Sequence, residues 1–178
     1  MKMNVRQGVF ETNSSSTHAI VFRKGPKIDG PDRWTVEEGL NQLRHMGVSV
    51  TEDLVWDGRT KATKQVYDLD FSTMDEELAE FGRTEEAYNE WGVKLLYAIA
   101  SFKNDEDRWE DLFKYLRTLG IRKIALKSVY NEWSERWETM GDIDHDSTTV
   151  LADMLGQGMS LDDYLSRKDI YCLIDNEG

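Results

Sequence analysis

The chain has 178 residues, of which 39% are apolar and 11% aromatic, and its formal net charge at pH 7 is −12. This apolar and aromatic content is sufficient for the core of one domain and argues against a disordered chain. The negative charge disfavours general coating of DNA or RNA, because an acidic surface repels phosphates. It suits either a partner with a basic groove or simply solubility. Cys172 is the only cysteine, which excludes an intrachain disulfide and a cysteine-based zinc site.

The sequence also predicts a location. The first eight residues lack the apolar stretch of a signal peptide. No segment approaches the roughly 20 apolar residues of a membrane span. We therefore expect a reducing cytoplasm, in which Cys172 is a small core residue of the apolar run 170–174.

The first 71 residues predict strands and one helix. Residues 18–22 form a short apolar run typical of a buried strand. A helix is expected to begin at Thr35, which is followed by two glutamates. Residues 47–64 are ambiguous between a strand and a hairpin with a loop at Asp57-Gly58, and residues 65–71 alternate like a second strand.

The middle of the chain is predicted to be helical. Apolar residues at helical spacing indicate one helix over 84–102 and another over 105–119, with Gly120 as the stop. A strand over 121–126 follows directly.

The last 32 residues predict two short helices, over 147–155 and 161–165, and a closing strand over 170–174. The order of elements lacks the regular alternation of a doubly wound fold. We therefore predict a single α+β domain over 1–178. It has a small mixed or antiparallel sheet and a helical segment inserted in the middle of the chain.

The most polar candidate site precedes the first strand, in residues 10–18. Seven polar side chains and a histidine follow Phe10 there: Glu11, Thr12, Asn13, Ser14, Ser15, Ser16, Thr17 and His18. Such a segment can be a hydrogen-bonded turn or an anion-binding nest. It can also be a catalytic site in which His18 positions a serine hydroxyl and acts as acid or base.

A second candidate surrounds His145, which lies between Asp144 and Asp146 and before Ser147. One interpretation is a helix N-terminus capped by Ser147. Another is a histidine oriented by a carboxylate. A third is a divalent metal site that combines His18, His145 and one aspartate.

The third candidate is Asp175-Asn176-Glu177, directly after the last strand. Polar groups at strand ends collect around sites, although a charged tail is the ordinary interpretation. His45 lies inside a helical pattern, and we interpret it as structural.

The segment Arg6-x-Gly-x-Phe-Glu-Thr-Asn-Ser-Ser-Ser-Thr-His18 resembles the opening of a family of small proteins carried by bacteriophages and other mobile elements. Members of that family tend also to carry an Asp-His-x-Ser element, matched here by residues 144–147, and a final strand ending in Asp-Asn, matched by Asp175 and Asn176. The family has no established reaction. The resemblance implies a setting in the cytoplasm of a host cell and a target in host defence, CRISPR nucleases above all.

Two functional hypotheses from different classes follow, and a third possibility is a housekeeping phage protein with an unrelated small-molecule substrate. The first is a phage-type anti-defence enzyme that cuts a phosphodiester in RNA, or in RNA presented by a ribonucleoprotein, with its metal requirement left open. A local basic patch, for which Arg6, Arg23 and Lys24 are candidates, would have to offset the net charge. The catalytic residues are then His18, His145, Asp144 and Ser16, and the substrate-binding residues are Glu11, Asn13, Ser14, Ser15, Asp175 and Asn176.

The second hypothesis is a non-catalytic acidic inhibitor. Such a protein occupies the basic nucleic-acid groove of a host nuclease by charge mimicry. The serine-rich segment would then be a structural turn.

Overall fold

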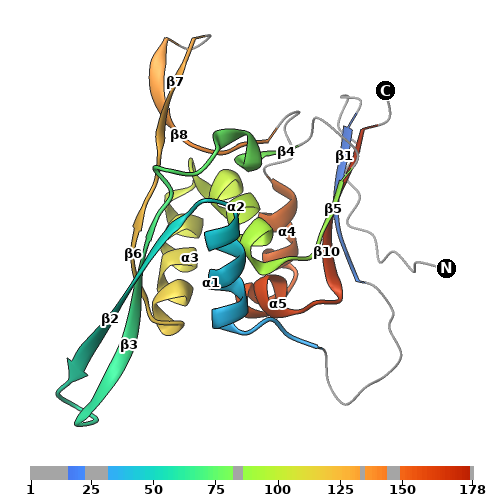
Figure 1. Cartoon of the computed structure of the whole chain (residues 1–178). Helices are drawn as coiled ribbons and strands as arrows, with labels where there is room; N and C mark the ends of the chain where they lie inside the picture. Colours follow the sequence, from blue (N-terminus) through green and yellow to red (C-terminus); the bar gives the residue numbers. More distant parts are fainter. Residues whose placement is uncertain (1–15, 23–31, 82–85, 133–134, 144–148, 177–178) are drawn as a thin grey trace.

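The structure is a computed structural model that describes residues 16–22, 32–81, 86–132, 135–143 and 149–176. Helices form a middle layer between two small sheets (Figure 1). The helices are α1 (Val36–His45), α2 (Trp91–Phe102), α3 (Glu106–Thr118), α4 (Thr149–Gly156) and α5 (Leu161–Ser166).

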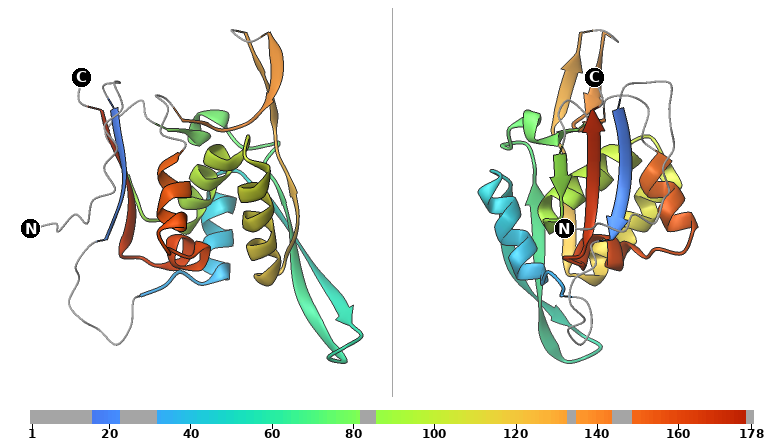
Figure 2. Two further views of the ribbon diagram at one scale, coloured as in Figure 1. Left: turned by 180° about the vertical axis from the view of Figure 1, so that it is seen from behind. Right: turned by 90° about the vertical axis from the view of Figure 1, so that its right-hand side faces the viewer.

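One sheet joins segments from both ends of the chain. It consists of β1 (Ser16–Phe22), β10 (Ile170–Asn176) and β5 (Glu86–Tyr88), in the order β1-β10-β5 and entirely antiparallel. In the left view of Figure 2 the sheet stands beside α4 and α5, and in the right view it lies in front of the helices.

The second sheet lies on the other side of the helices (Figure 1). Its strands are β2 (Ser49–Asp57), β3 (Ala62–Asp70) and β6 (Ile121–Ala125), in the order β2-β3-β6. β2 and β3 are antiparallel, whereas β3 and β6 are parallel. This sheet is therefore mixed.

Two short strand pairs complete the fold. β4 (Glu80–Phe81) follows the 3-10 helix η1 (Glu76–Ala79) and pairs with β9 (Asp142–Ile143). β7 (Ser128–Asn131) and β8 (Arg136–Thr139) form a hairpin that projects from the body (Figure 1).

The centre of the core is α2, in which every residue except Val93 is buried. The expected stripe along this helix is confirmed: Trp91, Leu95, Ile99 and Phe102 are all buried. Gly39 of α1 lets the two helices approach closely, because a Cβ atom there would lie 2.6 Å from the Trp91 ring.

Local signals in the sequence fix the ends of several elements as predicted. Thr35 caps α1 in a capping box: its hydroxyl accepts from the Glu38 N–H, and the Glu38 carboxylate accepts from the Thr35 N–H at 2.7 Å. Asp105 caps α3 by accepting from the Arg108 N–H. Gly120 follows α3 with φ +88°, the left-handed conformation that favours glycine.

The hairpin alternative for residues 47–64 is correct, and Asp57 organises its turn. The Asp57 carboxylate accepts from the Arg59 N–H and from the Thr60 hydroxyl, both at 2.9 Å. The backbone carbonyl of Asp57 accepts from the Lys61 N–H, also at 2.9 Å. These bonds close the loop between β2 and β3.

The helix expected over 84–102 is wrong in its first part. α2 begins at Trp91, and β5 precedes it as an extended segment. β5 pairs with β10, where Tyr88 lies opposite Cys172. A free edge of a sheet offers backbone hydrogen bonds to an extended segment, and this pairing overrides local helix propensity. Thr84 lies outside the described residues.

The α+β class with small sheets is confirmed. The strands divide into two three-stranded sheets, however, where the sequence suggested one, and the β7–β8 hairpin was not predicted at all. The helix expected from Ser147 begins, in the described part of the chain, at Thr149. Among the helices that the structure describes, none is long and apolar enough to cross a membrane.

Candidate functional site

The first and third sequence motifs become neighbours in the β1-β10-β5 sheet. In the antiparallel register Ser16 lies opposite Asn176, Thr17 opposite Asp175, and His18 opposite Ile174. The backbones of the serine-rich motif and of the Asp-Asn ending thus share one end of a strand pair, although about 160 residues separate them in sequence. This is the part of the sequence-predicted site that the fold brings together.

The other members of that site lie outside the described residues. They are Glu11, Asn13, Ser14, Ser15, Asp144 and His145. For Ser16, His18, Asp175 and Asn176 the structure describes the backbone. The convergence of His18 with His145 therefore stays a prediction, as does a metal site built on the two.

Outside those positions, the described residues contain no group of three or more His, Cys, Asp or Glu side chains that could hold a metal ion. His45, which we interpreted as structural, is exposed in the last turn of α1. Its Nδ1 atom lies 2.7 Å from the carbonyl oxygen of Asn41. A histidine in this place suits the negative end of the helix dipole.

A buried lysine is the strongest electrostatic feature that the sequence did not reveal. Lys94 of α2 has no solvent exposure, and its Nζ donates to the carbonyl oxygen of Arg167 at 2.8 Å. The same Nζ lies 5.8 Å from the centre of the Tyr164 ring. Burial lowers the pKa of Lys94 to about 7, an effect that the charge of Asp169 partly opposes.

Two further polar groups complete this buried cluster. Cys172 is buried as expected, and burial raises the pKa of its thiol to about 12, opposed in part by a hydrogen bond with Tyr97. Burial also raises the pKa of the Tyr97 hydroxyl well above its usual value. A cluster closed to solvent cannot receive a substrate, so we do not include it in the candidate site.

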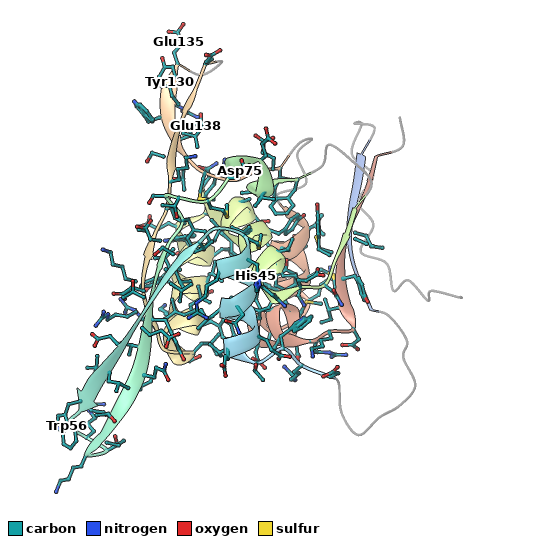
Figure 3. All side chains as sticks on the ribbon, in the orientation of Figure 1. His45, Trp56, Asp75, Tyr130, Glu135 and Glu138 are labelled. Carbon is teal, nitrogen blue, oxygen red and sulfur yellow. The ribbon has the colours of Figure 1, made fainter. Side chains whose placement is uncertain are left out.

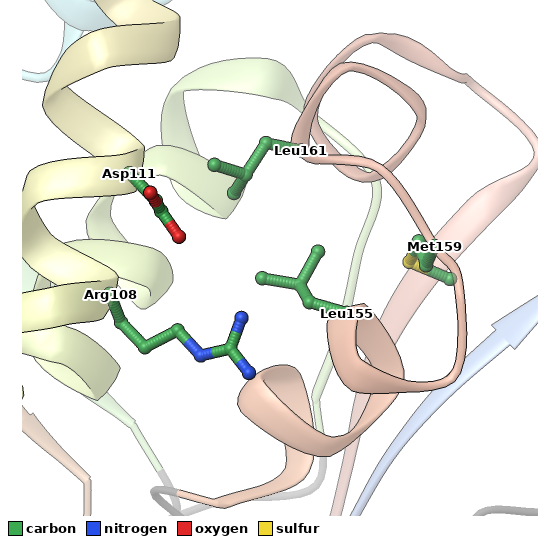
Figure 4. Close-up of a pocket in the computed structure, with 5 residues that line it drawn as sticks. All are labelled: Arg108, Asp111, Leu155, Met159 and Leu161. Atoms are coloured by element: carbon green, nitrogen blue, oxygen red, sulfur yellow. The ribbon is translucent and has the colours of Figure 1, made fainter.

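A hollow of about 320 Å³ lies between α3 and the α4–α5 segment (Figure 4). Its lining consists of Arg108, Asp111, Leu155, Met159 and Leu161. The two charged residues have opposite signs and come from the same helix. The charged side chains of the lining therefore balance each other, and the hollow has no net charge to attract an ionic ligand.

No protein-family model, curated protein or solved structure matches this chain. Its function must therefore be argued from its own surface.

The most unusual surface feature of the described residues is the pair of projecting hairpins, β2–β3 and β7–β8 (Figures 1 and 3). Both carry large apolar side chains in contact with solvent. Trp56 is 62% exposed on the first hairpin, and Trp137 is 70% exposed on the second. Exposed aromatic residues on projecting elements are typical of binding surfaces.

The face of the β2–β3 hairpin that carries Trp56 is the continuation of the core face of its sheet. Val50 packs against the core, and Leu69 opposite it is buried. Because side chains alternate along a strand, Leu54 and Trp56 belong to the same face as Val50. The far part of the β2–β3 hairpin extends beyond the helical layer (Figure 1), and Leu54 is 67% exposed. The hairpin was one of two alternatives in the sequence, and only the position of the helices shows that this face is uncovered.

The β7–β8 hairpin carries an aromatic pair. Tyr130 and Trp137 lie directly opposite each other, with ring centres 5.5 Å apart and planes at 63°. Tyr130 is 48% exposed. At the base of the hairpin Val129 packs against the core and Met140 is buried, so the hairpin has a fixed root.

Proposed function

We propose that the protein is an acidic, non-catalytic inhibitor that occupies the basic nucleic-acid groove of a host-defence nuclease through its β7–β8 hairpin. The observation that carries this proposal is the exposed pair of Tyr130 and Trp137 on a projecting, acidic hairpin. Tyr and Trp are the side chains most often found at the energetic centre of protein interfaces.

The charge of the hairpin supports the same partner. Residues 128–139 contain three glutamates and one arginine. Glu132 and Glu135 are exposed next to the loop, whereas Glu138 is paired with Arg136 at 2.8 Å. Carboxylates of this kind can take the place of phosphates, and flat rings can take the place of bases, in a groove that normally holds nucleic acid. The net charge of −12 adds long-range attraction toward such a groove.

The test is inhibition of a purified RNA-guided CRISPR nuclease, measured as target-DNA cleavage against inhibitor concentration. Replacing both Tyr130 and Trp137 by alanine should raise the inhibitory concentration by about 30-fold or more, the effect of losing an interface hot spot. Leu78→Ala, which removes an exposed apolar side chain from η1 (46% exposed), is the matched control. Added salt should weaken inhibition. Equal inhibition by the double variant and the wild type contradicts the proposal.

A second candidate function is cleavage of a phosphodiester in RNA. The observation that favours it is the register that sets Ser16 and Thr17 opposite Asn176 and Asp175, because it joins two of the three polar motifs. In this proposal His18 acts as acid or base.

The same assay separates the two functions. His18→Ala should abolish an enzymatic effect while leaving the melting temperature unchanged, and it should leave non-catalytic inhibition intact. Loss of activity in His18→Ala, together with full activity in the Tyr130/Trp137 double variant, replaces the first proposal by the second.

A further inference from the structure

The tip of the β2–β3 hairpin is a local exception to the acidic charge of the chain. Residues 58–65 contain three cations and no carboxylate, in a protein whose net charge is −12. The cations are Arg59, Lys61 and Lys64, and all three are exposed. Across the residues that the structure describes, none of the three makes an ion pair within 4.0 Å.

Three carboxylates further down the hairpin are engaged in ion pairs with arginines outside it. Glu52 pairs with Arg44 and also accepts from the side-chain amide of Gln65. Asp53 and Asp68 share Arg122, at 3.3 Å and 2.6 Å respectively. These contacts engage carboxylates of the hairpin other than Asp57, and the tip cations are exposed to solvent.

Asp57 is the one acid at the tip, and its carboxylate is engaged in the turn. It accepts from the Arg59 N–H and the Thr60 hydroxyl, and these bonds lower the pKa of Asp57 below its usual value. The loop that carries Arg59 and Lys61 is therefore held in one shape. A held loop loses little conformational entropy when it binds a ligand.

Trp56 adds a flat apolar surface beside these cations. It precedes the turn by one residue and lies opposite Thr63, on the uncovered face defined by Leu54 and Trp56. Lys64 lies opposite Val55 and therefore on the other face. Trp56, labelled in Figure 3, therefore lies close in sequence to the turn that carries Arg59 and Lys61, and Lys64 belongs to the opposite face of the same hairpin.

We propose that the tip of the β2–β3 hairpin binds single-stranded nucleic acid, with Trp56 stacking on a base and Arg59, Lys61 and Lys64 contacting phosphates. Aromatic stacking next to basic side chains is the general mode of single-strand recognition. An exposed indole can stack only on a base that is not already stacked in a duplex. This distinguishes the site from a groove-binding β-ribbon, which reads paired bases from their edges.

The net charge of the chain does not prevent this binding. From Ser49 to Asp57 the hairpin extends over about 25 Å at the usual rise of a strand. The Debye length is only about 10 Å at 0.1 M salt. Carboxylates on the body are therefore screened from a phosphate at the tip, whereas the three tip cations act on it directly.

The experiment is fluorescence anisotropy with the full chain and labelled oligomers of uridine and of deoxyuridine, about 12 nucleotides long, from about 20 mM salt upward. We expect both oligomers to bind. Trp56→Ala should weaken binding about 10-fold, from the loss of one stacked base. Replacing the three cations (Arg59→Gln, Lys61→Gly, Lys64→Gln) should reduce the log–log salt slope by about 2. Lys61 has φ +53°, which glycine adopts without strain, so this variant keeps its fold.

The control variant removes three exposed cations elsewhere (Lys114→Gln, Arg117→Gln, Lys123→Gln), and it should bind like the wild type. Tighter binding of the uridine oligomer identifies RNA as the natural ligand, through the 2′-hydroxyl, and the reverse order identifies DNA. The proposal is overturned if no oligomer binds, if a duplex binds as tightly as a single strand, or if the tip and control variants lose affinity equally. Tyr130 and Trp137 play no part in this binding. A negative result in the oligomer assay therefore does not contradict the proposed function, and a negative result in the inhibition assay does not contradict nucleic-acid binding at the hairpin tip.

Discussion

The buried ammonium of Lys94 makes a specific prediction about the pH dependence of stability. The pKa of Lys94 is about 7 in the folded protein, against an ordinary value of 10.5. Between these two values the unfolded chain binds more protons than the folded chain. The free energy of unfolding must therefore rise as the pH rises. Below about pH 7 both states are protonated, and the full penalty of the buried charge, about 5 kcal/mol, opposes folding.

The window for measurement is pH 7 to 9. Over this range the Lys94 contribution should raise the free energy of unfolding by about 2 kcal/mol. Above pH 9 the buried thiol of Cys172 acts in the opposite direction. Its pKa is raised from 9.0 to about 12, so the unfolded chain loses this proton first and stability falls.

Lys94→Met removes the charge and keeps most of the side-chain volume. We expect the free energy of unfolding of this variant to lack the increase that Lys94 causes between pH 7 and 9. It should also be about 2 kcal/mol more stable than the wild type at pH 7, because the gain from the lost charge exceeds the loss of the hydrogen bond to Arg167.

The assay is urea unfolding followed by tryptophan fluorescence at pH 6, 7, 8 and 9. Lys114→Met, at an exposed lysine of α3, is the matched control and should follow the wild-type curve. Other titrating groups are common to all three proteins, and they cancel in the difference. The reasoning is refuted if the free energy of unfolding rises equally for Lys94→Met and for the wild type from pH 7 to 9. It is also refuted if the variant is the less stable of the two at pH 6.

Three further predictions concern local packing and capping. Thr35→Ala should lower the free energy of unfolding by about 1 kcal/mol in urea titrations, because it removes the hydroxyl that accepts from Glu38; an unchanged midpoint would contradict the capping role. Gly39→Ala should lower the free energy of unfolding by about 1 to 3 kcal/mol, because the added Cβ would lie 2.6 Å from the Trp91 ring. A melting temperature equal to that of the wild type would show that α1 and α2 can separate freely. Cys172 should react with a thiol reagent only on unfolding, because it is 1% exposed and its pKa is raised, and rapid labelling of the native protein would refute its burial.

Signals that act between near neighbours in the chain were readable from the sequence. The capping box of Thr35, the stop at Gly120 and the turn at Asp57 each depend on backbone within a few residues. The apolar stripe of α2 was likewise visible, because a helix repeats every 3.6 residues whatever surrounds it. The chemistry of residues 10–18 could be named as a candidate site, although not placed.

Features that depend on distant partners were decided only by the tertiary structure. The pairing of β5 with β10 turned an expected helical segment into a strand, and β1 found its partner at the other end of the chain. The burial of Lys94 and the exposure of Trp56 follow from which faces the helices cover. The sequence by itself determined most of the helices, the caps and turn named above, and the net charge, since these are properties of short segments or of composition. The fold decided strand partners, buried charge and open binding faces, because each requires groups far apart in sequence to meet, or to fail to meet, in space.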